Sequence, residues 1–243
     1  MHKRLALAAL GFLLSPLPAV SQVLDAHPGV PVVIDAGHGG EDLGAVAHGA
    51  YEKDIVLSVA GRLKAALAET GTSRGILLRE GDAYLPLDER VAKSVAVDGE
   101  EFISLHVNQV RSKRSSGITI YVFGKSSDRW ARKTRPVRKL TPLAPPPRQA
   151  VLASLRLANA LTRSLTGEGF KVEPVRRSAF YVLKNPRLPS VLVELGYLSN
   201  PREAELLKDP GYQDRLARSL AQGLAEYTMQ ARRKTERSAT TGR

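Results

Sequence analysis

Short apolar runs alternate with longer amphipathic segments along most of the chain. Each apolar run has the length of a strand and is bounded by turn residues or polar residues, which predicts a buried β-strand. Strands are predicted at residues 31–36, 75–79, 101–106, 117–123, 179–184 and 190–194. Apolar residues recur every three or four positions elsewhere, which predicts helices at residues 52–69, 87–97, 151–165 and 212–229.

Strands that alternate with helices predict an α/β fold. We expect a single domain in which a mostly parallel central sheet of about six strands is covered by helices on both faces. The 243 residues, 43% of them hydrophobic, provide one core of ordinary size. A further helix is predicted to start at Asn200 as the cap, with Pro201 at the first helical position and Glu203 completing a capping box.

The two ends of the chain differ in composition from the part between them. Residues 1–21 combine a short positive segment, an apolar run and small residues at the cleavage positions, which is typical of a secretory signal peptide. The alternative is an uncleaved N-terminal anchor. We expect residues 22–30 to be a linker, residues 31–229 the folded domain and residues 230–243 a disordered basic tail.

The formal net charge of +12 indicates which partners to expect. Loss of residues 1–21, which hold Lys3 and Arg4 and no acidic residue, lowers this charge by two, from +12 to +10. A basic exported protein is attracted to acidic polymers of the cell envelope. Nucleic acid also fits the charge, but the chain has no nucleic-acid recognition motif, and export argues against that partner. No later run approaches the roughly 18 apolar residues of a transmembrane span, so none is expected in the exported protein.

Residues 125–148 have a composition that does not fit a core. This segment contains eight Lys or Arg residues, five prolines and a single acidic residue, Asp128. We therefore expect an exposed loop or insertion within the domain.

Three residues at the ends of predicted elements are candidate metal ligands. His38 follows the first predicted strand in a glycine-rich loop, Glu52 lies in the first turn of the next helix, and His106 ends the third strand. The carboxyl ends of parallel strands meet at one edge of a sheet, so we expect the three side chains to face that edge. Because the chain has no cysteine, any zinc must be held by His, Asp or Glu. Two imidazoles and a carboxylate suit zinc and leave one coordination position open.

Each of these residues also has an ordinary structural interpretation. His38 alone fits a hydrogen-bonded loop residue, Glu52 a carboxylate at the positive end of a helix, and His106 a buried histidine with satisfied hydrogen bonds. His27 and His48 are interpreted as solvated. Of these two, His48 is the one that most nearly mimics a ligand, because it is close to Glu52 in sequence.

Glu194 is the candidate catalytic carboxylate. It follows the apolar residues Val191, Leu192 and Val193, which place it at the end of a buried strand. Burial of an ionised glutamate is unfavourable unless a cation is near. A water molecule activated by a metal beside Glu194 explains this position, with Glu194 as general base and then as general acid toward a leaving amine. The alternative is a salt bridge to a nearby Arg or Lys.

Four motifs follow one another along the chain. They are Asp35-Ala-Gly-His38-Gly-Gly-Glu-Asp-Leu-Gly44-Ala, Glu52-Lys-Asp54, Ser104-Leu-His106-Val-Asn108 and Val193-Glu194-Leu-Gly-Tyr-Leu-Ser-Asn200-Pro. Together they resemble the family of zinc-dependent N-acetylmuramoyl-L-alanine amidases of the amidase family 3 type, over about residues 31–229. One departure is Leu78-Arg79-Glu80, which stands where the family more often has Thr-Arg.

The resemblance implies a reaction and a site. His38, Glu52 and His106 would bind Zn²⁺, and Glu194 would be the catalytic carboxylate. The bond cleaved would be the amide between the lactyl group of N-acetylmuramic acid and L-alanine of the peptidoglycan stem peptide. Such an enzyme acts in cell-wall remodelling or daughter-cell separation. Asp35 and Asn108 are candidates to orient the ligands, or to make purely structural hydrogen bonds.

The expected partner is peptidoglycan, in the periplasm, the cell envelope or the extracellular space. We expect a monomer, and the need for a protein activator stays open. The basic segment, residues 125–148, has three interpretations: it binds peptidoglycan, it covers the site as a regulatory element, or it is a solvated loop without a function. Two other functions compete with the amidase: a catalytically silent peptidoglycan-binding protein on the same fold, and a zinc peptidase that cleaves another amide.

Overall fold

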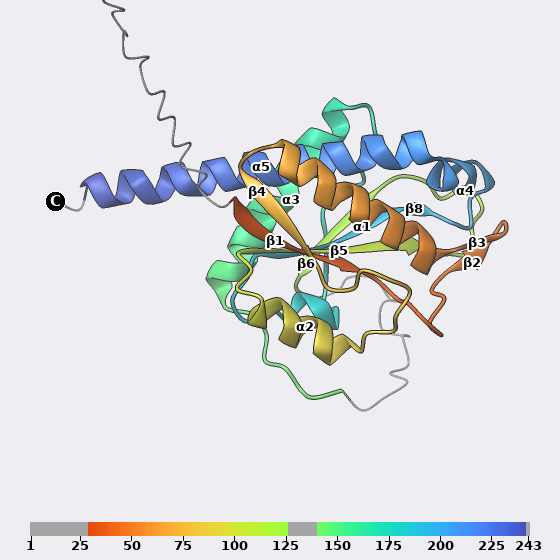
Figure 1. Cartoon of the computed structure of the whole chain (residues 1–243), viewed down its shortest axis with the longest axis horizontal. Helices are drawn as coiled ribbons and strands as arrows, with labels where there is room; N and C mark the ends of the chain where they lie inside the picture. The colour runs from red at the N-terminus through yellow and green to blue at the C-terminus, as the bar shows by residue number, and fades with distance from the viewer. Residues whose placement is uncertain (1–28, 126–139, 242–243) are drawn as a thin grey trace, which may run out of the picture.

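A six-stranded sheet with helices on both faces forms the framework of the protein (Figure 1). The computed structural model describes residues 29–125 and 140–241, so the predicted signal peptide and most of the linker lie outside the described residues. The elements in chain order are β1 (Val30–Ala36), β2 (Val46–Ala47), β3 (Ala50–Tyr51), α1 (Glu52–Glu69), β4 (Ser73–Leu77), α2 (Leu87–Ala96), β5 (Glu101–Asn108), β6 (Thr119–Phe123), α3 (Arg148–Gly167), β7 (Arg176–Ser178), the 3₁₀ helix η1 (Tyr181–Leu183), β8 (Ser190–Tyr197), α4 (Pro201–Lys208) and α5 (Pro210–Thr241).

The strand order of the sheet is β4-β1-β5-β8-β6-β7. The first four of these strands run parallel to one another. β6 pairs antiparallel with β8, and β7 pairs parallel with β6, so the direction reverses once across the sheet. The predicted α/β fold with a mostly parallel sheet of about six strands is therefore confirmed. A separate two-stranded hairpin, β2-β3, leads into α1.

Two hydrophobic cores of unequal size lie on the two faces of the sheet. The larger core packs α1, α3 and α5 on one face. The smaller core lies on the other face and includes η1, which contacts α2 on the same side of the sheet (Figure 1). Alternate residues of β1 enter the two cores: Val32 and Ile34 face the larger, and Val33 faces the smaller. Because strands in this position are covered on both faces, their sequences are almost continuously apolar.

The apolar face that the sequence predicts for the first helix is the face that α1 buries. Val56, Val59, Ala60, Leu63, Ala66 and Leu67 are all buried against the sheet and α5. The polar residues Lys64 and Glu69 lie off this face and are exposed.

The prediction of a strand at residues 179–184 is wrong. This stretch contains η1, and the neighbouring strand β7 ends before it, at Ser178. Val182 and Leu183 are both buried in the smaller core although they are adjacent in sequence. A strand would point two adjacent side chains to opposite faces, whereas a turn of helix allows both to face the same core.

The predicted start of α4 is confirmed at Asn200, but the predicted capping box does not form. The Asn200 side chain accepts hydrogen bonds from the N–H groups of Arg202 and Glu203. The Glu203 carboxylate instead accepts from the N–H groups of Gly117, at 2.6 Å, and Tyr197, at 2.7 Å. Glu203 therefore ties α4 to the start of β6 and the end of β8, a tertiary role that a local motif does not predict.

The prediction of a disordered tail at residues 230–243 is wrong as far as Thr241, because α5 continues to that residue. Thr228 is the last buried residue of α5 in the part whose burial is described, and residues 229–237 are exposed. Residues 230–241 contain no proline or glycine, and adding residues to an existing helix needs no new nucleus. The Gln230 side chain also donates a hydrogen bond to Glu226 one turn earlier, at 2.8 Å.

Most of the basic segment, residues 125–148, lies outside the described residues, which resume at residue 140. The segment ends earlier than its composition indicates, because Arg148 is the first residue of α3. Residue Thr141 is held near the smaller core, where its carbonyl accepts a hydrogen bond of 2.7 Å from the Tyr181 hydroxyl.

Glu101, the first residue of β5, is a buried carboxyl group at the amino-terminal edge of the parallel strands. It is 3% exposed, and its Oε1 accepts a hydrogen bond of 2.7 Å from the Thr228 hydroxyl of α5. Its Oε2 is buried and has no hydrogen-bond partner within the described part of the chain. Burial raises the pKa of Glu101 to about 8; the nearby charge of Glu100 adds to the rise, and the Thr228 hydrogen bond opposes it.

We predict that Glu101→Gln changes how stability depends on pH. The pKa of Glu101 is about 8 in the folded chain and 4.5 ordinarily, so between these values the folded chain holds a proton that the unfolded chain lacks. The free energy of unfolding therefore falls as pH rises through this window, by up to about 1.4 kcal/mol per pH unit from this group. In Glu101→Gln the part of this pH dependence that comes from residue 101 should be absent.

Urea unfolding of both proteins from pH 4.5 to pH 8.5 measures the difference. Glu100→Gln removes the same charge from the exposed neighbour and should retain most of the wild-type pH dependence. Parallel pH profiles for wild type and Glu101→Gln would contradict the assignment.

Candidate metal centre and catalytic carboxylate

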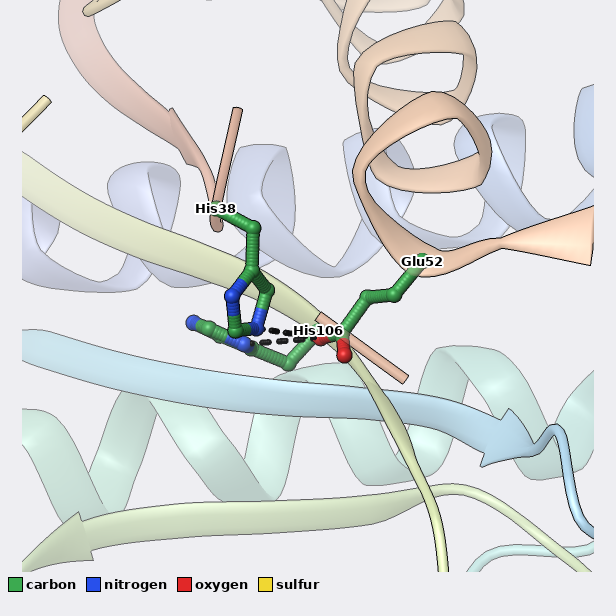
Figure 2. A group of neighbouring side chains, drawn as sticks. All are labelled: His38, Glu52 and His106. Carbon is green, nitrogen blue, oxygen red and sulfur yellow. Dashed lines mark hydrogen bonds and ion pairs between the residues drawn. The ribbon is translucent and has the colours of Figure 1, made fainter. Parts of the chain in front are cut away.

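The structure brings His38, Glu52 and His106 together from three separate elements (Figure 2). His38 lies in the loop after β1, Glu52 is the first residue of α1, and His106 lies near the end of β5. One nitrogen or oxygen atom from each of the three side chains lies within 4.8 Å of the other two. Among the residues that the structure describes, this is the one group of three such side chains placed to hold a metal ion.

The Glu52 carboxylate lies at the centre of the group and is 4% exposed. Its Oε1 lies 2.9 Å from His106 Nδ1 and 3.1 Å from His38 Nε2. The same oxygen accepts a hydrogen bond of 2.9 Å from Val107 N–H, and Oε2 accepts one of 2.7 Å from Ala45 N–H. Burial disfavours the charge on Glu52, but the hydrogen bonds and charges of His106 and His38 outweigh burial and lower its pKa.

His38 is oriented by a second carboxylate, that of Asp42. His38 Nδ1 lies 2.8 Å from Asp42 Oδ2, which leaves Nε2 directed at Glu52. Burial disfavours the charged imidazole, but the contacts with Glu52 and Asp42 outweigh it and raise the pKa of His38 to about 9. A carboxylate behind a histidine is the common way to fix the orientation of a metal-binding ring. The sequence reasoning missed Asp42, whose only signal is its position four residues after His38.

Two glycines allow the three side chains to approach one another. A Cβ atom on Gly37 would lie 2.4 Å from Cε1 of His106. A Cβ atom on Gly44 would lie 2.6 Å from Glu52 Oε2, and the backbone there has φ of +66°. The His38 and His106 rings then pack edge to face, with centroids 5.0 Å apart.

The donor set fits a zinc ion. Two imidazole nitrogens and one carboxylate oxygen are a common three-ligand set of catalytic zinc, which keeps its fourth position for water or substrate. A buried, ionised carboxylate between two histidines also supplies the negative charge that a divalent cation requires. The role of the three residues as metal ligands stays a prediction.

Glu194 lies beside this group on β8, where its Cα is the register partner of His106 on β5. The strand continues to Tyr197, so Glu194 lies inside it rather than at its end as predicted. Its Oε2 is buried and has no hydrogen-bond partner in the described part of the chain. The alternative interpretation, a salt bridge to an Arg or Lys, is therefore not seen at this oxygen among the described residues. Burial and the Glu52 charge raise the pKa of Glu194 to about 8, while His38 opposes the rise.

The remaining candidate residues lie outside the group. Asp35 pairs with Arg90 at 2.5 Å and accepts a hydrogen bond from Ser104, so it does not contact a ligand side chain directly. Asn108 accepts a backbone hydrogen bond from Leu198, which joins β5 to the end of β8. His48 is exposed at the turn of the β2-β3 hairpin, in agreement with its interpretation as solvated. His27 lies outside the described residues.

Three comparisons with known proteins show what the chain as a whole is similar to. Residues 32–226 match the family model described as N-acetylmuramoyl-L-alanine amidase. The chain is 34% identical to the uncharacterized protein YqiI of Bacillus subtilis over 228 residues, which covers 93% of this chain and 97% of that protein. It is 30% identical over 222 residues to the N-acetylmuramoyl-L-alanine amidase AmiC of Escherichia coli, covering 79% of this chain and 51% of AmiC, about half its length. The solved structure of the amidase AmiC2 of Nostoc punctiforme is similar with a TM-score of 0.68 at 27% identity, covering 82% of this chain and 97% of that one.

We predict that His38→Asn weakens zinc binding and that His48→Asn does not. Both histidines have a left-handed backbone, with φ of +57° and +50°, a conformation that asparagine tolerates well. The two variants therefore make the same chemical change on similar backbones, one inside the group and one outside. Loss of one of three ligands should lower zinc affinity by at least about 100-fold.

Competition of the metal-free protein against a chromogenic zinc chelator at fixed pH measures both affinities. Equal zinc affinity for wild type and His38→Asn would remove His38 from the ligand set.

Proposed function

The chain belongs to the N-acetylmuramoyl-L-alanine amidase family, and from that premise we propose that it hydrolyses the amide between N-acetylmuramic acid and L-alanine of the peptidoglycan stem peptide. The observation that carries the proposal is the placement of Glu194, a buried carboxyl group without a polar partner on Oε2, on the strand beside His106. In this proposal His38, Glu52 and His106 hold one Zn²⁺, and Glu194 moves the proton.

Zinc supplies Lewis acidity, which makes water a better nucleophile near neutral pH and polarises the carbonyl of the scissile amide. Glu52 provides the anionic ligand, and its hydrogen bonds to the N–H groups of Ala45 and Val107 hold the carboxylate in one orientation. Asp42 keeps Nδ1 of His38 engaged, so that Nε2 is the nitrogen available to the ion.

Glu194 carries the proton between water and the leaving amine. A carboxyl group with a pKa of about 8 in the metal-free chain is shifted toward the pH at which it can both accept and return a proton. A cation held by the neighbouring residues would favour the ionised form, as the charge of His38 already does. Glu194 accepts a proton as water attacks the carbonyl, and then gives that proton to the amino group of the departing L-alanine.

We further propose that the protein is exported and acts on the cell wall. The signal-peptide pattern of residues 1–21 supports export, and the basic charge of the remaining chain favours attraction to an anionic wall polymer. Within the part of the chain that the structure describes, no helix is long and apolar enough to span a membrane. The expected role is remodelling of peptidoglycan or separation of daughter cells.

We predict that Glu194→Gln abolishes most of the turnover while leaving the metal site occupied. The amide of glutamine keeps the shape of the side chain but cannot accept the proton, and loss of a general base typically lowers a rate by about 10²–10⁴-fold. The assay follows the release of stem peptides from purified sacculi by the zinc-loaded protein. Glu226→Gln is the matched control, because Glu226 lies on α5 and pairs with Arg163 on a helical face away from the site.

The products distinguish the competing functions. Free stem peptides with an L-alanine amino terminus, released in a chelator-sensitive reaction, support the amidase. Peptides cut internally would indicate a zinc peptidase, and binding of sacculi without release would indicate a catalytically silent protein. Full turnover by Glu194→Gln would show that the proton is carried by another group.

A further inference from the structure

Two buried arginines surround the backbone that leads to His38, and neither belongs to the proposed set of ligands. Arg79 follows β4 and is 5% exposed, and Arg90 lies on α2 and is 3% exposed. Both guanidinium groups donate to backbone carbonyls at the end of β1, where the sheet ends and the loop that carries His38 begins.

Arg79 links the His38 loop to the first turn of α1. Its Nε donates to Ala36 O at 2.8 Å, and its Nη2 donates to both Gly37 O and Lys53 O at 2.9 Å. Gly37 immediately precedes His38, and Lys53 immediately follows Glu52. A single guanidinium group therefore connects the backbone next to one candidate ligand with the backbone next to another.

Arg90 holds the same loop from the other side. Its Nη1 donates to Ala36 O at 2.8 Å, and its Nη2 donates to His38 O at 2.7 Å. The carboxylate of Asp35, which is fully buried, pairs with Nη1 and accepts a hydrogen bond from Ser104 of β5. Asp35 is therefore linked to His38 through Arg90, without contacting the side chain of a candidate ligand.

A second connection, here called the outer bridge, joins the His38 loop to the start of α1 through the side chains of Lys53 and Asp82. Lys53 Nζ donates to Gly40 O at 2.9 Å and pairs with Asp82 Oδ2 at 2.6 Å. Asp82 Oδ1 in turn accepts from Gly40 N–H at 2.7 Å. The hydrogen bond from Lys53 and that from the Gly40 N–H lower the pKa of Asp82. The His38 loop and the start of α1 are thus joined twice, once through Arg79 and once through Lys53 and Asp82.

The burial of two like charges near each other, and the backbone conformation of His38, are each unfavourable in themselves. Burial lowers the pKa of Arg79, the like charge of Arg90 lowers it further, and the Asp35, Asp82 and Asp54 carboxylates oppose both effects. His38 also keeps a left-handed backbone, with φ of +57°, which is uncommon for a residue other than glycine. The buried charges of Arg79 and Arg90 and the strained backbone of His38 meet at one loop. This indicates that the position of the loop matters for function as well as for packing.

We propose that Arg79, Arg90 and Asp82 form a positioning clamp that sets the distance between His38 and Glu52 before the metal binds. Fixed ligands lose less freedom when an ion arrives, so the clamp raises metal affinity without touching the ion. This inference rests on the proposed role of His38, Glu52 and His106 as zinc ligands.

Arg79→Lys tests the clamp, because lysine keeps the charge but cannot reach Ala36, Gly37 and Lys53 at the same time. We expect its zinc affinity to fall by about 10- to 100-fold, the usual effect of losing a group that orients ligands. The visible absorption spectrum of the Co²⁺-substituted protein should also change in position or intensity, because the ligand geometry is less uniform. Arg62→Lys is the matched control, since Arg62 lies further along α1 and pairs with Asp214 of α5.

Asp82→Asn is a second variant that does not put folding at risk, because the Asp82 side chain is 49% exposed. It weakens only the outer bridge, so we expect a smaller decrease in zinc affinity, of about threefold or more. If Arg79→Lys does not fold, as judged by circular dichroism, Asp82→Asn decides the question.

The outcomes separate this inference from the proposed function. If the wild-type protein does not bind one zinc ion per chain, the metal site itself is wrong. If the wild type binds zinc and both folded variants keep its affinity and its Co²⁺ spectrum, the clamp is wrong. If the variants unfold at a lower temperature but keep the wild-type zinc affinity and Co²⁺ spectrum, the clamp is also wrong, because such residues would support only the fold.

Discussion

The carboxylate of Glu52 is the group on which the geometry of the site depends. It is almost fully buried, and a buried carboxylate must be surrounded by donors or positive charge. Its donors come from three segments: Ala45 just before the β2-β3 hairpin, the end of β5, and the loop after β1. Satisfying this single group therefore draws together the segments that carry both histidines. The glycines at 37 and 44 follow from the same requirement, because a side chain at either position would occupy the space of a donor or of the carboxylate itself.

The features that the sequence predicts well are those that depend on local pattern or on strand polarity. Runs such as residues 31–36 are apolar on both faces, which in this fold occurs only where helices cover both sides. Once β1, β5 and β8 are parallel, their carboxyl ends meet, so His38, His106 and Glu194 must share an edge. The position of Glu52 beside them was expected because it begins the helix that follows the His38 loop.

What the sequence does not predict depends on partners that are distant along the chain. Glu203 has the spacing of a capping box, yet it bonds Gly117, which is 86 positions away. Val182 and Leu183 have strand-like composition, but both are buried in the smaller core. Arg79 stands in a stretch that resembles a family motif and Arg90 stands in none, but for both only the tertiary structure shows that backbone carbonyls near His38 are their partners. The spacing of residues along the chain does not reveal a residue that acts through the backbone of another.

The course of α5 carries several positive charges away from the edge of the sheet that holds the histidines. The helix begins beside α4, near the edge where β8 ends, and by Thr228 it has reached Glu101 at the opposite edge of the sheet. The exposed residues Arg232, Arg233 and Lys234 therefore extend beyond the edge that lacks the histidines, on the arm that projects from the body in Figure 1. These three cations therefore add to the net charge without lying beside the histidines. A polyanion attracted to this arm would approach the molecule from the side opposite the histidines, and this attraction would bias how the protein lies on a charged surface.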